Sequence, residues 1–218
     1  MFISEFDKKG NTSIEQNHIT GGLAIFLTGY STVGKNLFAD MIQNHPKLKK
    51  KRIKQFSFAR PLRRDLRLFS ERVLKIDINT KNPIKKEALR PFLVLYVEFK
   101  RKRTQGQYFI NGIKGEIKHS LNTGHICLIT DCRYAEYPKD ELQYAKEAGL
   151  LVNIERYRIL DGSPNNKEFV GPPNEHEARN GPKMKEAADW HVIWGDDKAE
   201  KQKCVDDFIT FVQTIYKI

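Results

Sequence analysis

The sequence predicts an α/β protein in which a parallel sheet of about five strands is covered by helices on both faces. Two nearly apolar runs, Leu23–Thr28 and 126–130, are short and sharply bounded, as is typical of strands that are buried on both faces. Segments of helical periodicity alternate with such runs along the chain. The first run also leads through a glycine-bracketed turn directly into a helix, which is a strand–turn–helix beginning.

Size and composition favour one globular domain. The chain has 218 residues, of which 39% are hydrophobic and 30% charged, so a sizeable core is expected and disorder is not. We expect residues 1–22, which are mostly polar and carry no secretory pattern, to be a flexible extension of a domain at 23–218. No apolar run approaches the roughly 20 residues that span a membrane. The three cysteines lack metal or redox spacing, so a reduced, cytoplasmic location is expected.

The charge balance is basic. Lysine and arginine total 38 against 27 acidic residues, which gives a net charge of +11. Such an excess attracts polyanions, and it leaves nucleic acid, free nucleotide and a merely solvated surface as alternatives. The basic run at 47–54 contains no aromatic side chains, so we interpret it as a solvent-exposed loop rather than a nucleic-acid site.

The first elements are predicted with clear limits. The strand Leu23–Thr28 precedes a helix at 35–44, whose apolar residues fall on one face and which Pro46 ends. Residues 53–58 alternate between apolar and polar and indicate a second strand.

The middle of the chain is predicted to be helical and then irregular. Residues 61–74 have apolar side chains at helical spacing, and 77–83 form a turn-rich break. A helix is expected at 86–102, with Pro91 at its true start or at a kink. Four glycines in 104–124 favour an irregular segment there.

The last part returns to alternation. A buried strand at 126–130 precedes a helix at 140–148, for which Gly149 is the expected C-terminal cap, and then a strand at 151–155. Residues 157–183 are rich in Gly, Pro and Asn and predict a long functional loop. A short strand at 190–193 and a helix at Lys198–Tyr216 close the chain.

The turn after the first strand carries the strongest motif. Gly29, Gly34 and Lys35 have the G-x-x-x-x-G-K spacing of a phosphate-binding loop, against the alternative of chance glycines in a plain turn. Backbone N–H groups of such a loop and the following helix N-terminus bind phosphate oxygens, and the lysine reaches the β- and γ-phosphates. The ATP phosphate-binding candidates are Gly29, Ser31, Thr32, Val33, Gly34, Lys35, Asn36 and Leu37. Asn36 replaces the usual Ser or Thr, so its amide is a weak candidate ligand for Mg²⁺.

A second group of polar residues follows the strand at 126–130. Ligands of open parallel sheets bind beyond the carboxyl ends of the strands, so Asp131 and Arg133 are expected on the same edge as the glycine-bracketed turn. Asp131 is a candidate for a water-mediated Mg²⁺ contact or a substrate hydroxyl, and Arg133 for a phosphate clamp. A surface ion pair is the alternative. With Lys35, these two residues are the catalytic candidates.

The chain is also rich in arginine. Phosphoryl transfer needs positive charge around the migrating group more than it needs covalent chemistry, so arginines at strand ends are candidates for that task. A solvated cation is the alternative for each. The candidates are Arg60, Arg63, Arg64, Arg90, Arg101, Arg103, Arg156 and Arg158.

Taken in order, these pieces resemble the bacteriophage-type deoxynucleoside monophosphate kinases of the P-loop kinase superfamily. The resemblance runs from residue 23 to about residue 197 and rests on short motifs beyond the loop. The matching segments are Gly34-Lys35-Asn36-Leu37, Phe58-Ala59-Arg60-Pro61-Leu62-Arg63, Arg90 with Arg101, Tyr108-Phe109, Asp131-Cys132-Arg133, Arg156, Asn174-Glu175-His176-Glu177 and Ala188-Asp189-Trp190.

The resemblance implies a three-layer P-loop kinase fold and transfer of the ATP γ-phosphate, with Mg²⁺, to a (deoxy)nucleoside 5′-monophosphate. It makes 157–183 a lid with Arg156 and Arg158 at its hinge. Small-molecule nucleotides are the expected partners, without nucleic acid or membrane, and a homodimer is left open. The residues implied on the monophosphate side are Arg60, Arg90, Arg101, Tyr108, Asp131 and Arg133.

Departures from the family pattern keep alternatives open. Asn36-Leu37 lacks the family's acid and hydroxyl, and Arg60 replaces an acidic or small residue. A kinase for another small acceptor, a catalytically inactive nucleotide-binding member and a nucleic-acid-binding module are therefore retained. A regulatory GTPase is disfavoured because no Asn-Lys-x-Asp motif is present. His176 is interpreted as a lid or surface residue, since no second ligand lies at metal spacing.

Overall fold

The structure is a computed structural model that describes residues 21–160, 163 and 166–217. The expected N-terminal extension at 1–22 therefore lies almost wholly outside the described residues. Among the described helices, none combines the length and the apolar character needed to cross a membrane.

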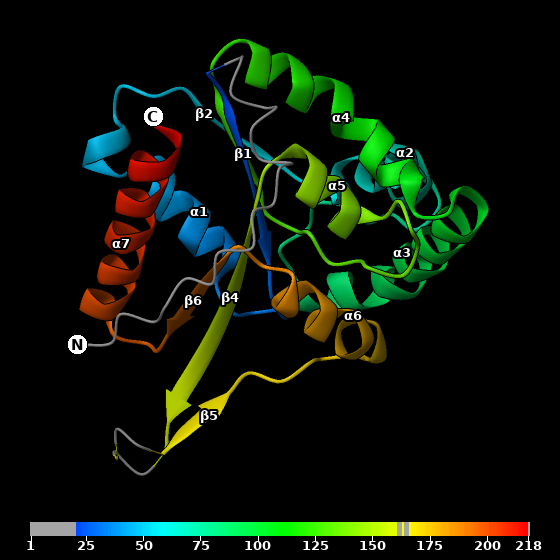
Figure 1. Ribbon diagram of the computed structural model, residues 1–218. Helices are drawn as coiled ribbons and strands as arrows, with labels where there is room; N and C mark the ends of the chain where they lie inside the picture. Colours follow the sequence, from blue (N-terminus) through cyan, green and yellow to red (C-terminus); the bar gives the residue numbers. More distant parts are fainter. Residues whose placement is uncertain (1–20, 161–162, 164–165, 218) are drawn as a thin grey trace.

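A mostly parallel sheet forms the centre of the fold, as predicted (Figure 1). Its parallel strands follow the order β2-β3-β1-β4-β6, and the short strand β5 pairs antiparallel with β4. In β1, Phe26 lies opposite Ile129 of β3 on one side and Leu151 of β4 on the other, which explains its unbroken apolar sequence. The strands are β1 (Leu23–Thr28), β2 (Ile53–Phe56), β3 (Ile126–Ile129), β4 (Leu150–Ile159), β5 (Lys167–Phe169) and β6 (Trp190–Trp194).

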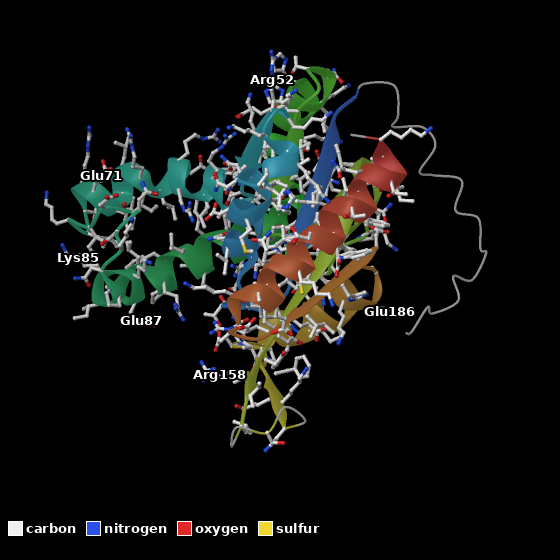
Figure 2. The ribbon with its side chains drawn as sticks, turned by 90° about the vertical axis from the view of Figure 1, so that its left-hand side faces the viewer. Arg52, Glu71, Lys85, Glu87, Arg158 and Glu186 are labelled. Carbon is white, nitrogen blue, oxygen red and sulfur yellow. The ribbon has the colours of Figure 1, made fainter. Side chains whose placement is uncertain are left out.

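Helices cover both faces of the sheet (Figure 1). One face carries α1 (Lys35–Gln43) and α7 (Lys198–Tyr216), with the short 3-10 helix η2 (Pro46–Leu48) between α1 and β2. The other face carries α4 (Gln107–Asn122), α5 (Glu141–Ala148) and α6 (Glu175–Glu186). A pair of helices, α2 (Ala59–Arg72) and α3 (Pro83–Thr104), packs on α4 and projects sideways, with Glu71, Lys85 and Glu87 at its far end (Figure 2).

Two apolar clusters, one on each face of the sheet, form the core. The first contains Phe38 of α1, whose ring lies 5.7 Å from that of Trp194 and 5.3 Å from that of Phe208. The second contains Phe26, whose ring meets the edge of Tyr144 at 5.6 Å. Side chains of alternating direction on β1 contribute to both clusters, so this strand ties the two faces together.

The irregular segment predicted at 104–124 is wrong, because the structure places helix α4 there. Gly106 and Gly124 have φ values of +84° and +76° and lie at the two ends of the helix. Inside the helix, Gly112 allows α2 to approach, since a Cβ there would lie 2.5 Å from Pro61. The glycines thus mark helix ends and a close contact, while Ile113 and Ile117 supply the buried face.

The long loop predicted at 157–183 is also partly wrong. Strand β4 continues to Ile159, β5 forms a projecting hairpin with it, and α6 begins at Glu175 (Figure 1). Gly and Pro in this segment predicted a loop, but Gly181 and Pro182 lie inside helix α6. Gly181 lets the ring of Tyr30 approach the helix closely, since a Cβ would lie 2.4 Å from that ring.

Helix α3 is longer than predicted. Asn82 caps it by accepting hydrogen bonds from the backbone N–H groups of Ile84 and Lys85, Pro83 occupies its first turn, and Pro91 lies inside it. The other predicted elements lie where expected within a few residues at their ends, and Gly149 does cap α5.

Candidate functional site

The glycine loop, residues 29–34 between β1 and α1, is shaped by its two glycines. Gly29 has φ of +125°, and a Cβ there would lie 2.2 Å from the carbonyl oxygen of Ile154. Gly34 has φ of +101°, and a Cβ there would lie 2.8 Å from the ring of Trp194. Both the backbone angle and the close approach therefore require glycine at these two positions.

Trp194 and Arg156 support the loop from β6 and β4. The indole Nε1 of Trp194 donates to the carbonyl oxygen of Val33 at 2.9 Å in a fully buried contact. Nη1 of Arg156 donates to the carbonyl oxygen of Thr32 at 3.4 Å, and Nη2 pairs with Asp196 at 2.6 Å. Buried Nε of Arg156 has no hydrogen-bond partner among the described residues. The neighbouring strands thus fix the loop's carbonyl groups.

Lys35, the first residue of α1, folds back over the loop. Its Nζ donates to the carbonyl oxygens of Gly29 and Tyr30 at 2.7 and 2.8 Å, and the residue is only 7% exposed. The pKa of Lys35 falls from 10.5 to about 8, first because of burial and next because of the Arg133 guanidinium; Glu177 and Asp131 oppose that fall. These charges are close enough to act on one another, as expected for one site.

Glu177 of α6 supplies an anion to the glycine loop. Its Oε2 accepts a hydrogen bond from the backbone N–H of Ser31 at 2.7 Å. Its Oε1 lies 3.3 Å from Nη1 of Arg133. The residue is 8% exposed, so this carboxylate is buried between the loop and a guanidinium. The loop therefore binds an oxygen anion through its backbone in this structure, as phosphate-binding loops do.

Asp131 connects the end of β3 to the start of α2. Its carboxylate accepts from the Ser57 hydroxyl at 2.6 Å and from the backbone N–H groups of Phe58 and Ala59 at 2.7 and 3.0 Å. Both oxygens are therefore engaged within the protein.

Arg133 is positioned through its backbone by a buried acid. Oε2 of Glu141 accepts from the backbone N–H of Arg133 at 2.7 Å and from that of Tyr134 at 3.2 Å. Burial raises the pKa of Glu141 to about 8, although Arg101 and the Arg133 backbone oppose that rise.

A metal ion at this site would be held mainly by phosphate and water. Mg²⁺ binds oxygen ligands and keeps several waters, and in nucleotide sites the phosphates supply part of its shell. Among the described residues, no group of three or more His, Cys, Asp or Glu side chains could hold a metal ion. Asn36 and Leu37 are exposed on the first turn of α1. The residues fit an ion held mainly by phosphate and water, with the Asn36 amide as the neutral donor.

Several residues expected on the monophosphate side have partners outside the glycine loop. Arg60 is exposed and paired with Glu116, and Arg90 is exposed and paired with Glu87 toward the far end of the α2–α3 pair (Figure 2). Arg101 is only 3% exposed, with Nη2 2.7 Å from Asp140.

Two further candidates lie away from the loop contacts. The hydroxyl of Tyr108 donates to Asp65 at 2.5 Å, which ties α4 to α2. Arg158 is exposed within the β4–β5 hairpin, where it lies opposite Glu168 of β5 (Figure 2). The structure thus gathers Lys35, Asp131 and Arg133 at one place, with Arg156 on the loop.

A pocket of about 230 Å³ is lined in part by residues next to Arg133 and Glu177 in the chain. It lies between α3, the segment after β3 and α6; Tyr134 of its lining follows Arg133 in the chain, and His176 precedes Glu177. On its wall the guanidinium of Arg101 lies 3.5 Å from the ring centre of Tyr134. The lining residues are Val97, Glu98, Arg101, Lys102, Tyr134, Glu136, Tyr137, His176 and Arg179.

Sequence reasoning assigned no role to Glu177 or Trp194. The spacing Asn174-x-x-Glu177 resembles a capping box, and Asn174 Oδ1 indeed accepts from the Glu177 backbone N–H at 2.9 Å. That spacing predicts the start of a helix where α6 begins. It does not predict that the carboxylate reaches Ser31, 146 residues away in the sequence. The contact of Trp194 with Val33 likewise depends on tertiary structure alone.

No protein-family model matches the sequence, and no curated protein matches it. Among solved structures, the chain is similar to dephospho-CoA kinase from Campylobacter jejuni, with 11% sequence identity and a TM-score of 0.48. The similarity covers 89% of this chain and 98% of that chain. The resemblance to bacteriophage-type deoxynucleoside monophosphate kinases is not confirmed by these comparisons.

Proposed function

We propose that this protein is a phosphotransferase that transfers the γ-phosphate of ATP to a (deoxy)nucleoside 5′-monophosphate. The observation that carries the proposal is the glycine loop: both glycines have the backbone angles that the loop needs, Lys35 lies over it, and the Ser31 N–H holds an anion. Phosphate oxygens make the same charge-assisted contacts with backbone N–H groups and lysine.

In this proposal the donor phosphates lie along the glycine loop at the N-terminus of α1. Lys35 would leave the carbonyl oxygens of Gly29 and Tyr30 and place its charge on the β- and γ-phosphates. Mg²⁺, when bound, would neutralise charge between those phosphates, with Asn36 as the protein donor. An acceptor phosphate oxygen bonds to the γ-phosphorus, the bond from phosphorus to the β,γ-bridging oxygen breaks, and ADP leaves.

The acceptor is assigned to the pocket beside Arg133. This arginine is 40% exposed at its side chain, pairs with Glu177 at the glycine loop and precedes Tyr134 of the pocket lining in the chain, so we place it beside the transferred phosphoryl group. The lining carries both signs of charge, with Lys102 and Arg179 as the cations proposed for the acceptor phosphate beside Glu98 and Glu136, and Tyr137 offers an aromatic surface to a base. Asp131 would position α2 beside the acceptor rather than bind it, because its oxygens are already engaged.

The test is a coupled assay for ADP formation from ATP with each nucleoside monophosphate in turn. Turnover with one of them, lost in the Lys35→Ala variant, is the expected result. If no monophosphate gives ADP above that variant, a broader screen of small phosphorylated and hydroxylated acceptors decides whether the protein is a kinase for another substrate.

Nucleotide binding without transfer is the second candidate function, and Asn36 is the observation that favours it. The usual hydroxyl ligand for Mg²⁺ is missing at this position. This alternative predicts ATP binding by calorimetry without turnover, and a gain of activity in Asn36→Thr.

A further inference from the structure

We infer that the Glu177 carboxylate is an internal anion that occupies the glycine loop of the ligand-free protein and has to leave when a polyphosphate binds. The inference rests on the proposed function, because it takes nucleotide phosphate as the competing ligand. It adds that nucleotide binding is coupled to the position of α6.

The position of the carboxylate is that of a bound anion. Its two oxygens contact the Ser31 N–H at 2.7 Å and Arg133 Nη1 at 3.3 Å, and the charge of Lys35 is close enough to be affected by it. A phosphate oxygen seeks the same three partners: a backbone N–H, a guanidinium and an ammonium. Carboxylate and phosphate cannot both hold the Ser31 N–H, so the two anions compete.

Helix capping does not require this contact. In a capping box, the fourth residue reaches back to the backbone N–H of the capping residue. Here Asn174 caps α6 through its own side chain, and the Glu177 carboxylate is directed at the glycine loop instead. Glu175, in the same first turn, is exposed and serves the helix N-terminus without touching the loop. Comparing variants of Glu175 and Glu177 therefore distinguishes the effect of a negative charge at the N-terminus of α6 from the effect of a carboxylate bound to the glycine loop.

Groups of the protein itself satisfy the loop's polar atoms in this structure. Lys35 binds its carbonyl oxygens, and Glu177 binds its Ser31 N–H. A polyphosphate would exchange both contacts and would release Arg133 from Glu177.

Displacing Glu177 also affects α6. This helix is held by the contact of Gly181 with Tyr30 and by Asn180, which accepts from the Ala135 N–H at 2.8 Å. Loss of the Ser31 contact removes the link between its first turn and the loop. Helix α6 carries His176 and Arg179 of the neighbouring pocket, so occupation of the loop would alter that pocket too.

Calorimetric titration with ATP tests the inference in three proteins: the wild type, Glu177→Gln and the matched control Glu175→Gln. Both variants remove one negative charge from the first turn of α6, but only one removes it from the loop. We expect Glu177→Gln to bind ATP roughly tenfold more tightly, since a competing charge-assisted contact is lost, and Glu175→Gln to stay within about twofold of the wild type. Glu177→Ala, which leaves no acceptor for the Ser31 N–H, should shift the affinity in the same direction and carries the test if the glutamine variant does not fold.

The outcomes distinguish this inference from the proposed function. If the wild type binds ATP and neither Glu177 variant binds it more tightly, the inference is wrong, whereas the proposed function is unaffected and is decided by the turnover assay. Weaker binding by both variants would make Glu177 a nucleotide-binding residue and would also overturn the inference. If none of the proteins binds ATP or inorganic tripolyphosphate, the proposed function fails together with it.

Discussion

Replacing Lys35 with methionine should remove a pH-dependent loss of unfolding free energy that comes from burying the Lys35 ammonium beside the glycine loop. The ammonium is buried at 7% exposure, and its pKa lies near 8 instead of 10.5. The unfolded chain therefore binds a proton more readily than the folded protein between these two values. Stability must rise as pH increases from about 8 to 10.5, and below pH 8 the whole cost is present.

The size of this cost follows from the gap between the two pKa values. A gap from 10.5 to about 8 corresponds to about 3 kcal/mol of unfolding free energy, which Lys35 takes from the stability at neutral pH. Because the side chain is buried, solvent screening reduces this value little. Methionine has a similar length and no charge, so the variant keeps most of the packing.

The assay is urea unfolding of the wild type and of Lys35→Met at several pH values from 7 to 10.5. Groups other than Lys35 titrate in both proteins, so the difference in unfolding free energy isolates the lysine. Loss of the contacts with Gly29 and Tyr30 adds an offset that does not depend on pH. The wild type should gain about 3 kcal/mol relative to the variant across this range. A difference that stays constant with pH would refute the reasoning.

Further predictions concern the surroundings of the loop. Burial raises the pKa of Glu141 from 4.5 to about 8. The free energy of unfolding should therefore fall by up to roughly 4 kcal/mol as pH rises from 4.5 to 8. Glu141→Gln should remove that fall, which urea unfolding at pH 5 and pH 8 measures. Arg101→Met should lower the free energy of unfolding by about 3–5 kcal/mol, because it leaves the buried Asp140 carboxylate without its cation. Chemical unfolding measures this loss, and the double variant Arg101→Met/Asp140→Asn should lose less. Gly34→Ala should abolish ATP binding in calorimetry and lower the melting temperature, because a Cβ would lie 2.8 Å from Trp194; unchanged ATP binding would contradict the loop geometry.

The parts predicted from the sequence are those in which local pattern and tertiary environment agree. Strand β1 is apolar throughout because both of its neighbours and both faces are protein, so a simple apolar run sufficed. The glycine loop was found because its two glycines answer steric demands at fixed spacing. Helix α7 was predicted with its observed bounds, since Asp197 caps it and its apolar residues fall on one face.

The predictions that were wrong concern residue types that occur in two different structural settings. Glycine usually breaks a helix, yet Gly112 and Gly181 lie in helices where another element approaches too closely for a side chain. An arginine in the sequence reads as a free cation, yet Arg101 is neutralised by Asp140 from a segment 39 residues away. The partners in these contacts lie far away in the sequence, so sequence periodicity could not have revealed them.

Arg60, Arg90, Arg101 and Arg133 are each paired with a carboxylate of the protein, and the burial of each pair bears on its availability to a phosphate. Exposed pairs contribute about 0–1 kcal/mol, so Arg60 and Arg90 can exchange partners at small cost, but they lie away from the loop contacts. The Arg101 pair is buried, and separating it would strand a charge in the interior. Arg133 is half-exposed, lies at the loop, and is paired with the one carboxylate that already occupies an anion position. Exchange of Glu177 for phosphate leaves no uncompensated charge on Arg133, so this arginine can meet the transferred group.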